Sequence, residues 1–105
     1  MPVVQFPSSG LTARDFEALR AEVARRLGRG LPGHVTRGFG QTGAMWAAIL
    51  DRPGGRPLQH FCREQGVYYL LDFTGRGEGR LVDAGRRFDE LLRHLPGPPS
   101  RITRT

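Results

Sequence analysis

The stretch Val67-Tyr-Tyr-Leu-Leu-Asp-Phe73 decides the fold, because it is the strongest strand in the chain by β-propensity. The two residues before it, Gln65-Gly66, are a signal for a tight reversal, so the preceding segment, Leu58 to Glu64, can pair with it as an antiparallel neighbour. A cluster of turn residues, Arg52-Pro-Gly-Gly-Arg-Pro57, stands before that segment. These features predict the centre of an antiparallel meander.

The segment on the other side of the turn cluster, Ala44 to Asp51, is ambiguous. Its composition favours a helix, whereas its short length and its bounding turns favour a strand. We expect a strand, since the turn cluster would return the chain as an antiparallel neighbour. Val35 to Gln41 can extend as a strand weakened by glycine, and Val3 to Phe6 is a candidate for a short edge strand.

Two amphipathic helices are expected beside these strands. Thr12 can cap a helix, with Asp15 as its capping-box partner, and apolar residues then recur at helical spacing, which predicts a helix over residues 13 to 27. The same spacing recurs near the end of the chain, at Leu81, Ala84, Phe88, Leu91 and Leu95. It predicts a second helix from about residue 82 to residue 95.

The predicted elements form a single α+β domain over residues 1 to 95, in the order β-α-β-β-β-β-α. It contains an antiparallel sheet of about four to five strands flanked by the two amphipathic helices. The chain, with 105 residues, is long enough for one such domain and too short for two. Residues 96 to 105 are expected to form a flexible C-terminal tail.

The charge of the chain suggests nucleic acid, but the reason for that charge is ambiguous. There are 16 basic residues, all of them arginine, against 10 acidic ones, which gives a net charge of +6. Because lysine and asparagine are both absent and both have codons beginning AA, a GC-rich genome would give the same bias without any function. No apolar run is long enough to span a membrane, and the single cysteine, Cys62, can form no internal disulfide. We therefore expect a soluble, cytoplasmic protein that does not contact membranes.

Two motifs resemble chemical sites, and each has a simpler structural interpretation. Gly38-Phe-Gly-Gln-Thr-Gly43 matches a phosphate-binding glycine pattern, but such loops need a helix after them or a lysine, and the chain has no lysine. His60, Cys62 and Glu64 alternate along one predicted strand, with His60 and Cys62 about 7 Å apart at the backbone and no orienting third group. We expect a bent or bulged strand end and a half-buried cysteine, with no cofactor, no metal and no enzymatic activity.

Arginines offer the best candidate for an anion site. The Gly-Arg loop, residues 75 to 80, leads into the second predicted helix, whose first turns hold Arg86 and Arg87, and helix-start amides with arginine forks suit phosphate. The candidate anion- or nucleic-acid-binding residues are Arg25, Arg26, Arg29, Arg76, Arg80, Arg86 and Arg87. Nucleic-acid binding requires these side chains to converge on one face.

Apolar residues occupy both alternating faces of the two central strands. One predicted set joins Met45, Ala47 and Ile49 with Tyr69, Leu71 and Phe73; the other joins Trp46 and Leu50 with Tyr68 and Leu70. A face packed on helices accounts for one set only. If both helices lie on the same side, the second set is exposed and marks a protein interface or a dimer; if they lie on opposite sides, everything is buried.

The leading hypothesis is a small non-enzymatic interaction protein of the inhibitor, immunity or adaptor type. It would dock on a protein partner through Trp46, Leu50, Tyr68 and Leu70, with arginine around this face, and a homodimer is compatible with it. The alternative is a nucleic-acid-associated protein that binds phosphate through dispersed arginines and loses its ligand steeply as salt is added. A third hypothesis is a hydrolase or transferase that uses Cys62 and His60.

Overall fold

The computed structural model describes residues 9 to 75 and 78 to 96. Two helices, a short 3₁₀ helix and five strands make up this part of the chain. In order, they are α1 (Ala13–Leu27), η1 (Leu31–His34), β1 (Val35–Phe39), β2 (Met45–Leu50), β3 (Pro57–Glu64), β4 (Val67–Asp72), β5 (Arg80–Gly85) and α2 (Phe88–Leu92). The predicted α+β class is confirmed, whereas the strand predicted at residues 3 to 6 and the tail from residue 97 onward lie outside the described residues. Neither of the two α-helices described is both long and apolar enough to cross a membrane.

The first helix forms as its sequence signals predict. The Thr12 hydroxyl accepts a hydrogen bond from the Asp15 amide, and the Asp15 carboxylate accepts one from the Thr12 amide, both at 3.0 Å. This reciprocal capping box satisfies two of the amides that have no partner within the helix. The buried stripe of α1 consists of Phe16, Leu19 and Val23, so the helix predicted over residues 13 to 27 is confirmed.

The five strands form one antiparallel sheet in chain order, β1 to β5, so each strand pairs with the one before it. The ambiguous segment after Ala44 is a strand, β2, as predicted. The reversal between β3 and β4 consists of Gln65 and Gly66, which have φ of 50° and 82°. A two-residue turn with positive φ at both positions matches the twist of a hairpin, and it places Glu64 opposite Val67 and Phe61 opposite Leu70.

The second predicted helix was wrong over its first half. Residues 80 to 85 form β5 along the edge of β4, and α2 spans only Phe88–Leu92. Strand pairing gives these residues interstrand hydrogen bonds that also satisfy the edge of β4, which outweighs a helical spacing carried by few residues. The spacing was coincidental at Leu81 and Ala84, since both are exposed, whereas Phe88 is buried.

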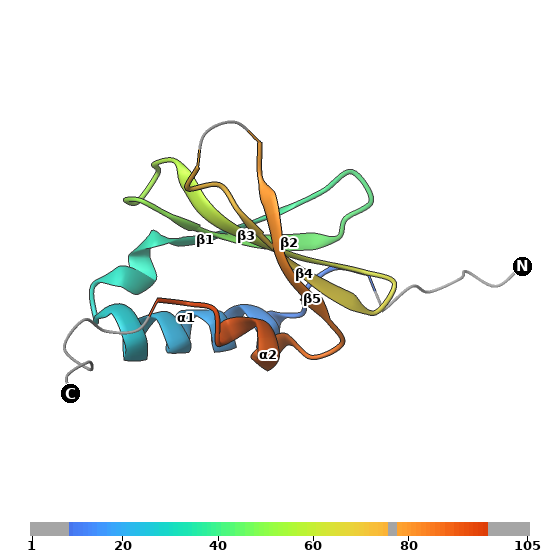
Figure 1. The fold of residues 1–105 in the computed structure, drawn as a ribbon, viewed down its shortest axis with the longest axis horizontal. Helices are drawn as coiled ribbons and strands as arrows, with labels where there is room; N and C mark the ends of the chain where they lie inside the picture. Colours follow the sequence, from blue (N-terminus) through green and yellow to red (C-terminus); the bar gives the residue numbers. More distant parts are fainter. Residues whose placement is uncertain (1–8, 76–77, 97–105) are drawn as a thin grey trace, which may run out of the picture.

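Both helices pack on the same side of the sheet (Figure 1). The largest fully buried side chains lie in the layer between helices and sheet, and they are Phe61, Leu19, Leu70, Leu91 and Val23. Within residues 9 to 75 and 78 to 96, no helix or strand covers the opposite face of the sheet. The fold therefore has two layers, and one face of its sheet is open.

Arg26 joins the end of α1 to the end of the domain. Its Nη1 donates hydrogen bonds to the carbonyl oxygens of Arg93 and Leu95, at 3.3 and 3.0 Å, while its Nε pairs with Glu22. We expect Arg26→Ala to lower the free energy of unfolding by about 1–2 kcal/mol, because the partly buried Leu95 carbonyl and the exposed Arg93 carbonyl both lose their donor. The matched control is Arg25→Ala, which removes an exposed arginine that also pairs with Glu22 and should cost at most about 0.5 kcal/mol. Urea unfolding compares the two, and equal losses would contradict this role of Arg26.

Candidate functional site

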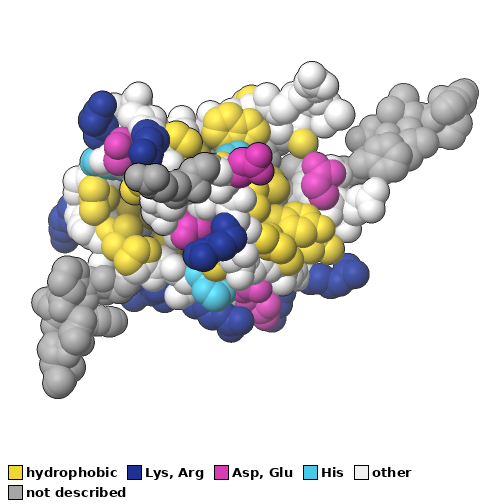
Figure 2. Space-filling model, turned by 45° about the horizontal axis from the view of Figure 1, so that its top comes forward, with side chains coloured by type: hydrophobic (Ala, Val, Ile, Leu, Met, Phe, Trp, Pro, Cys, Tyr) yellow, Lys and Arg dark blue, Asp and Glu magenta, His cyan; other side chains and the backbone are white. Residues whose placement is uncertain are grey.

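The uncovered side of the sheet, called here the open face, is the candidate site. Strand register aligns one row of side chains across it, namely Thr36, Ala48, His60, Leu71 and Leu81. A second row contains Gly38 opposite Trp46, and Cys62 opposite Tyr69. We define the open face by Trp46, Ala48, His60, Cys62, Tyr69, Leu71, Phe73 and Leu81. Figure 2 turns this side forward and shows hydrophobic side chains in several patches, with charged side chains between them.

The predicted pairing of Trp46 with Tyr68 and Leu70 was wrong. Tyr68 and Leu70 point to the helices and are only 7% and 0% exposed, so they belong to the core. Trp46 shares the open face with Tyr69 and Leu71 instead. Two registers cause this: the Gln65-Gly66 turn sets the phase of β4 against β3, and the pairing of β3 with β2 sets the phase of both against Trp46. Leu50, the fourth predicted residue, follows a β-bulge and is half-buried outside the core cluster.

Three aromatic rings lie side by side on the open face. The rings of Trp46 and His60 stack with centroids 5.2 Å apart, and Phe73 meets His60 edge-on at 6.3 Å. The Trp46 indole lies flat over Gly38 of β1, where any Cβ atom would collide with it. An aromatic ring that covers a strand glycine is fixed in place by the backbone beneath it, so this row is a preformed surface.

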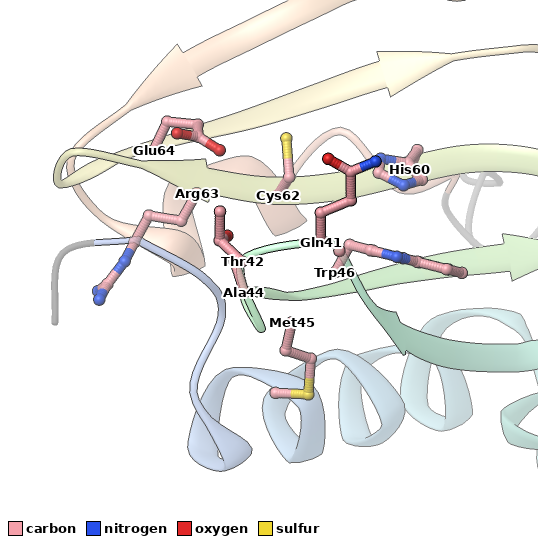
Figure 3. Close-up of a pocket in the computed structure, with 10 residues that line it drawn as sticks. Gln41, Thr42, Ala44, Met45, Trp46, His60, Cys62, Arg63 and Glu64 are labelled. Carbon is pink, nitrogen blue, oxygen red and sulfur yellow. The ribbon is translucent and has the colours of Figure 1, made fainter. Parts of the chain in front are cut away.

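A shallow pocket of about 250 Å³ opens beside this row. Figure 3 shows Cys62 and Glu64 on one side of the sheet, whereas Met45 and Arg63 point to the other. Burial, with help from the Glu64 charge, raises the pKa of the Cys62 thiol, and burial lowers the pKa of His60. A nucleophilic cysteine needs the reverse shifts, a thiolate beside an imidazolium. At neutral pH these two groups are therefore an uncharged thiol and an uncharged imidazole.

The other histidines lie away from this pocket. His94 is on the helix side, where its Nε2 is 2.8 Å from the Asp83 carboxylate and holds the pKa of that carboxyl below its usual value. His34 belongs to η1, before β1. Among the described residues, no three His, Cys, Asp or Glu side chains gather closely enough to hold a metal ion.

The candidate anion-binding arginines do not converge. Figure 1 places the end of α1, the start of β5 and the start of α2 in three separate regions. Arg25 and Arg29 lie at or just after the end of α1, Arg80 lies at the start of β5, and Arg86 and Arg87 lie just before α2. Arg26 is bound to main-chain carbonyls, Arg80 lies 3.5 Å from Asp72, and Arg87 lies 3.1 Å from Asp89. Arg76 lies outside the described residues. Nucleic-acid binding would require these arginines to share one face, and the candidate arginines that the structure describes do not.

The loop at residues 75 to 80 does not lead into a helix, which corrects the predicted anion site. Arg80 begins a strand, and α2 starts only at Phe88 and has five residues. The arrangement therefore does not bring helix-start amides to the loop.

The glycine pattern Gly38 to Gly43 forms the end of β1 and the hairpin into β2. The Gly40 amide donates to the Ala44 carbonyl at 2.9 Å, and Gly43 has φ of 86°. The hairpin turn uses the positive φ of Gly43, which is the strand-end interpretation given above. The strand-to-helix arrangement of dinucleotide loops is not formed here.

The residues that the sequence reasoning assigned to the wrong face are Tyr69, Leu71 and Phe73. The Gln65-Gly66 turn could have paired them with His60 and Cys62 of β3, because counting outward from a two-residue loop gives the β3–β4 register; the register of β3 against β2 has no such signal. Comparison of the chain with protein-family models, with curated proteins and with solved structures finds no match.

Proposed function

We propose that this protein is a non-enzymatic interaction protein that docks on a protein partner through its open face. The observation that carries this proposal is the aromatic row of Trp46, His60 and Phe73 on an uncovered sheet. The solvent side of an antiparallel sheet ordinarily alternates polar residues with the buried ones, whereas this side is apolar along β2 and β4. Aromatic residues are enriched at the centre of protein interfaces.

The type of interaction follows from the size and chemistry of the domain. An inhibitor, an immunity protein or an adaptor acts by contact alone, which a rigid sheet face can supply. The protonated thiol of Cys62 and the neutral His60 suit a contact surface, since neither brings a charge that a partner would have to desolvate. A single thiol outside any disulfide also suits the reducing cytoplasm.

The alternative, nucleic-acid binding, has less support. Phosphate binding through arginine needs several free side chains along one track. The described arginines of the candidate set lie in three regions, and several are engaged by acids or main-chain carbonyls.

Site-specific photo-crosslinking tests the proposed function. Benzoylphenylalanine is placed at Tyr69 on the open face, or at Ala18 on the exposed side of α1 as the control, in cells that produce the protein. We expect one defined protein adduct from Tyr69, retained when the lysed cells are brought to about 1 M salt before irradiation, and none from Ala18, because apolar docking is not screened by salt. The absence of an adduct at Tyr69, or equal adducts from both positions, would overturn the proposal.

A further inference from the structure

We propose that the partner on the open face is a second copy of this chain. Two sheets would pack face to face, with the helices of both copies on the outside. This inference rests on the proposed function, because it names the partner of the same surface.

The open face alternates large and small side chains, which suits packing against another sheet. Bulky side chains, such as Trp46 and Leu71, stand next to small ones, such as Ala48 and Cys62, in the aligned rows. Two sheets pack about 10 Å apart when side chains of this kind interdigitate. A copy of the same face offers matching ridges and hollows, and a twofold axis presents each to the other.

The size of the face suits a weak contact between copies. Five strands with about six residues each outline roughly 20 Å by 20 Å, or about 400 Å². This outline is about half of the ~800 Å² that each partner buries in a typical stable complex, so we expect the two copies to separate on dilution.

The charge distribution does not oppose a like partner. The strand ends and loops that border the open face carry both positive and negative charges. The basic residues are Arg52, Arg56 and Arg80, and the acidic residues are Asp51, Glu64, Asp72 and Glu78. An acidic partner is therefore not selected by this surface. The basic excess of the described residues lies elsewhere, and α1 in particular faces outward in the proposed dimer. Two sheets then separate the helix layers by more than the Debye length of about 8 Å, so the net charge opposes association only weakly.

The edges of the sheet are less suited to joining two copies. β5 carries a bulge between its pairs with Leu70 and Leu71, and the charged Arg80 and Asp83 lie on the same strand. Bulges and charges on edge strands prevent edge-to-edge pairing. The exposed side chains Phe39 and Val82 lie on opposite edges, β1 and β5, so they do not form one continuous apolar patch.

The experiment measures the mass of the purified full chain by light scattering from about 1 to about 100 µM, at low salt and at about 1 M salt. We expect a dimer at both salt concentrations, with Trp46, the single tryptophan, shifting its emission to longer wavelength when dilution separates the copies. Tyr69→Glu and Leu71→Glu should each give a monomer. Phe39→Glu on the β1 edge and Ala18→Glu on α1 should remain dimeric. Circular dichroism selects the variants that are folded, and two open-face variants guard against the failure of one.

A wild-type monomer at about 100 µM, or a dimer that persists in every folded open-face variant, would overturn the inference. A dimer lost in Phe39→Glu but kept in Tyr69→Glu would also overturn it, because the copies would then join at an edge. These outcomes leave the proposed function standing if Tyr69 still crosslinks to a different protein. If Tyr69 crosslinks to nothing, both proposals fail.

Discussion

Phe61→Ala is expected to lower the free energy of unfolding by about 3–5 kcal/mol, a large part of the total for a domain of this size. Phe61 is 0% exposed and pairs with Ala47 on one side and Leu70 on the other, at the centre of the sheet. Its ring meets that of Phe88 edge-on at 5.7 Å, so it also joins the sheet to α2. Truncation removes both contacts and leaves a cavity between two layers that cannot close over it.

The same substitution at Phe39 is the matched control, since Phe39 is 65% exposed at the edge of the sheet. We expect Phe39→Ala to change stability by no more than about 0.5 kcal/mol. Urea unfolding at one fixed protein concentration measures both, because the stability of an associating protein depends on concentration. Losses of similar size in the two variants would contradict the core position of Phe61.

Gly10→Ala is expected to cost about 3 kcal/mol of unfolding free energy, from two separate causes. Gly10 has φ of 90°, a region that alanine rarely adopts. A Cβ atom there would also stand 3.0 Å from the Ala44 Cα and the Met45 amide nitrogen, which are backbone atoms of β2 and the residue before it. Gly10 and Leu11 donate hydrogen bonds to the Arg63 and Met45 carbonyls, both at 2.9 Å, so the segment cannot move away without losing them.

Two other glycines separate these causes. Gly54 has φ of 74°, and a Cβ atom added to it would meet nothing within 4 Å, so Gly54→Ala should show the conformational cost alone, about 1–2 kcal/mol. Gly33 has neither feature, and Gly33→Ala should change stability little. Thermal and urea unfolding should rank the losses Gly10, Gly54 and Gly33 in that order. Equal losses at Gly10 and Gly54 would show that contact with β2 contributes nothing.

The sequence predicted that one apolar face of the sheet could be exposed, but it assigned the wrong residues of β4 to that face. Sequence alone indicated that β2 and β4 are apolar on both faces and that only one face could pack on helices. It did not give the phase between the strands, and a shift of one residue exchanges Tyr68 for Tyr69 and Leu70 for Leu71. The two-residue turn at Gln65-Gly66 contained half of that information, the register of β4 against β3, whereas the register of β3 against β2 was decided by tertiary packing.

The second predicted helix shows a different limit. Leu91 and Leu95 are buried in the core, as their spacing predicts. Residues 80 to 85 instead form a strand, because β4 offers them an unpaired edge. An edge contributed by residues distant in sequence is absent from any local window. Spacing over a few apolar residues therefore could not distinguish a strand followed by a short helix from one longer helix.

The sequence by itself determined what depends on neighbouring residues: the capped helix α1, the hairpin turns, the apolar strands and the net positive charge. Only the tertiary structure decided which side of the sheet both helices cover, where the arginines lie, and which aromatic side chains remain on the open face. The physical reason is the range of the forces. Capping, turn preference and periodicity act within a few residues, whereas strand register and layer packing are settled by burial and hydrogen bonding between segments far apart in the chain.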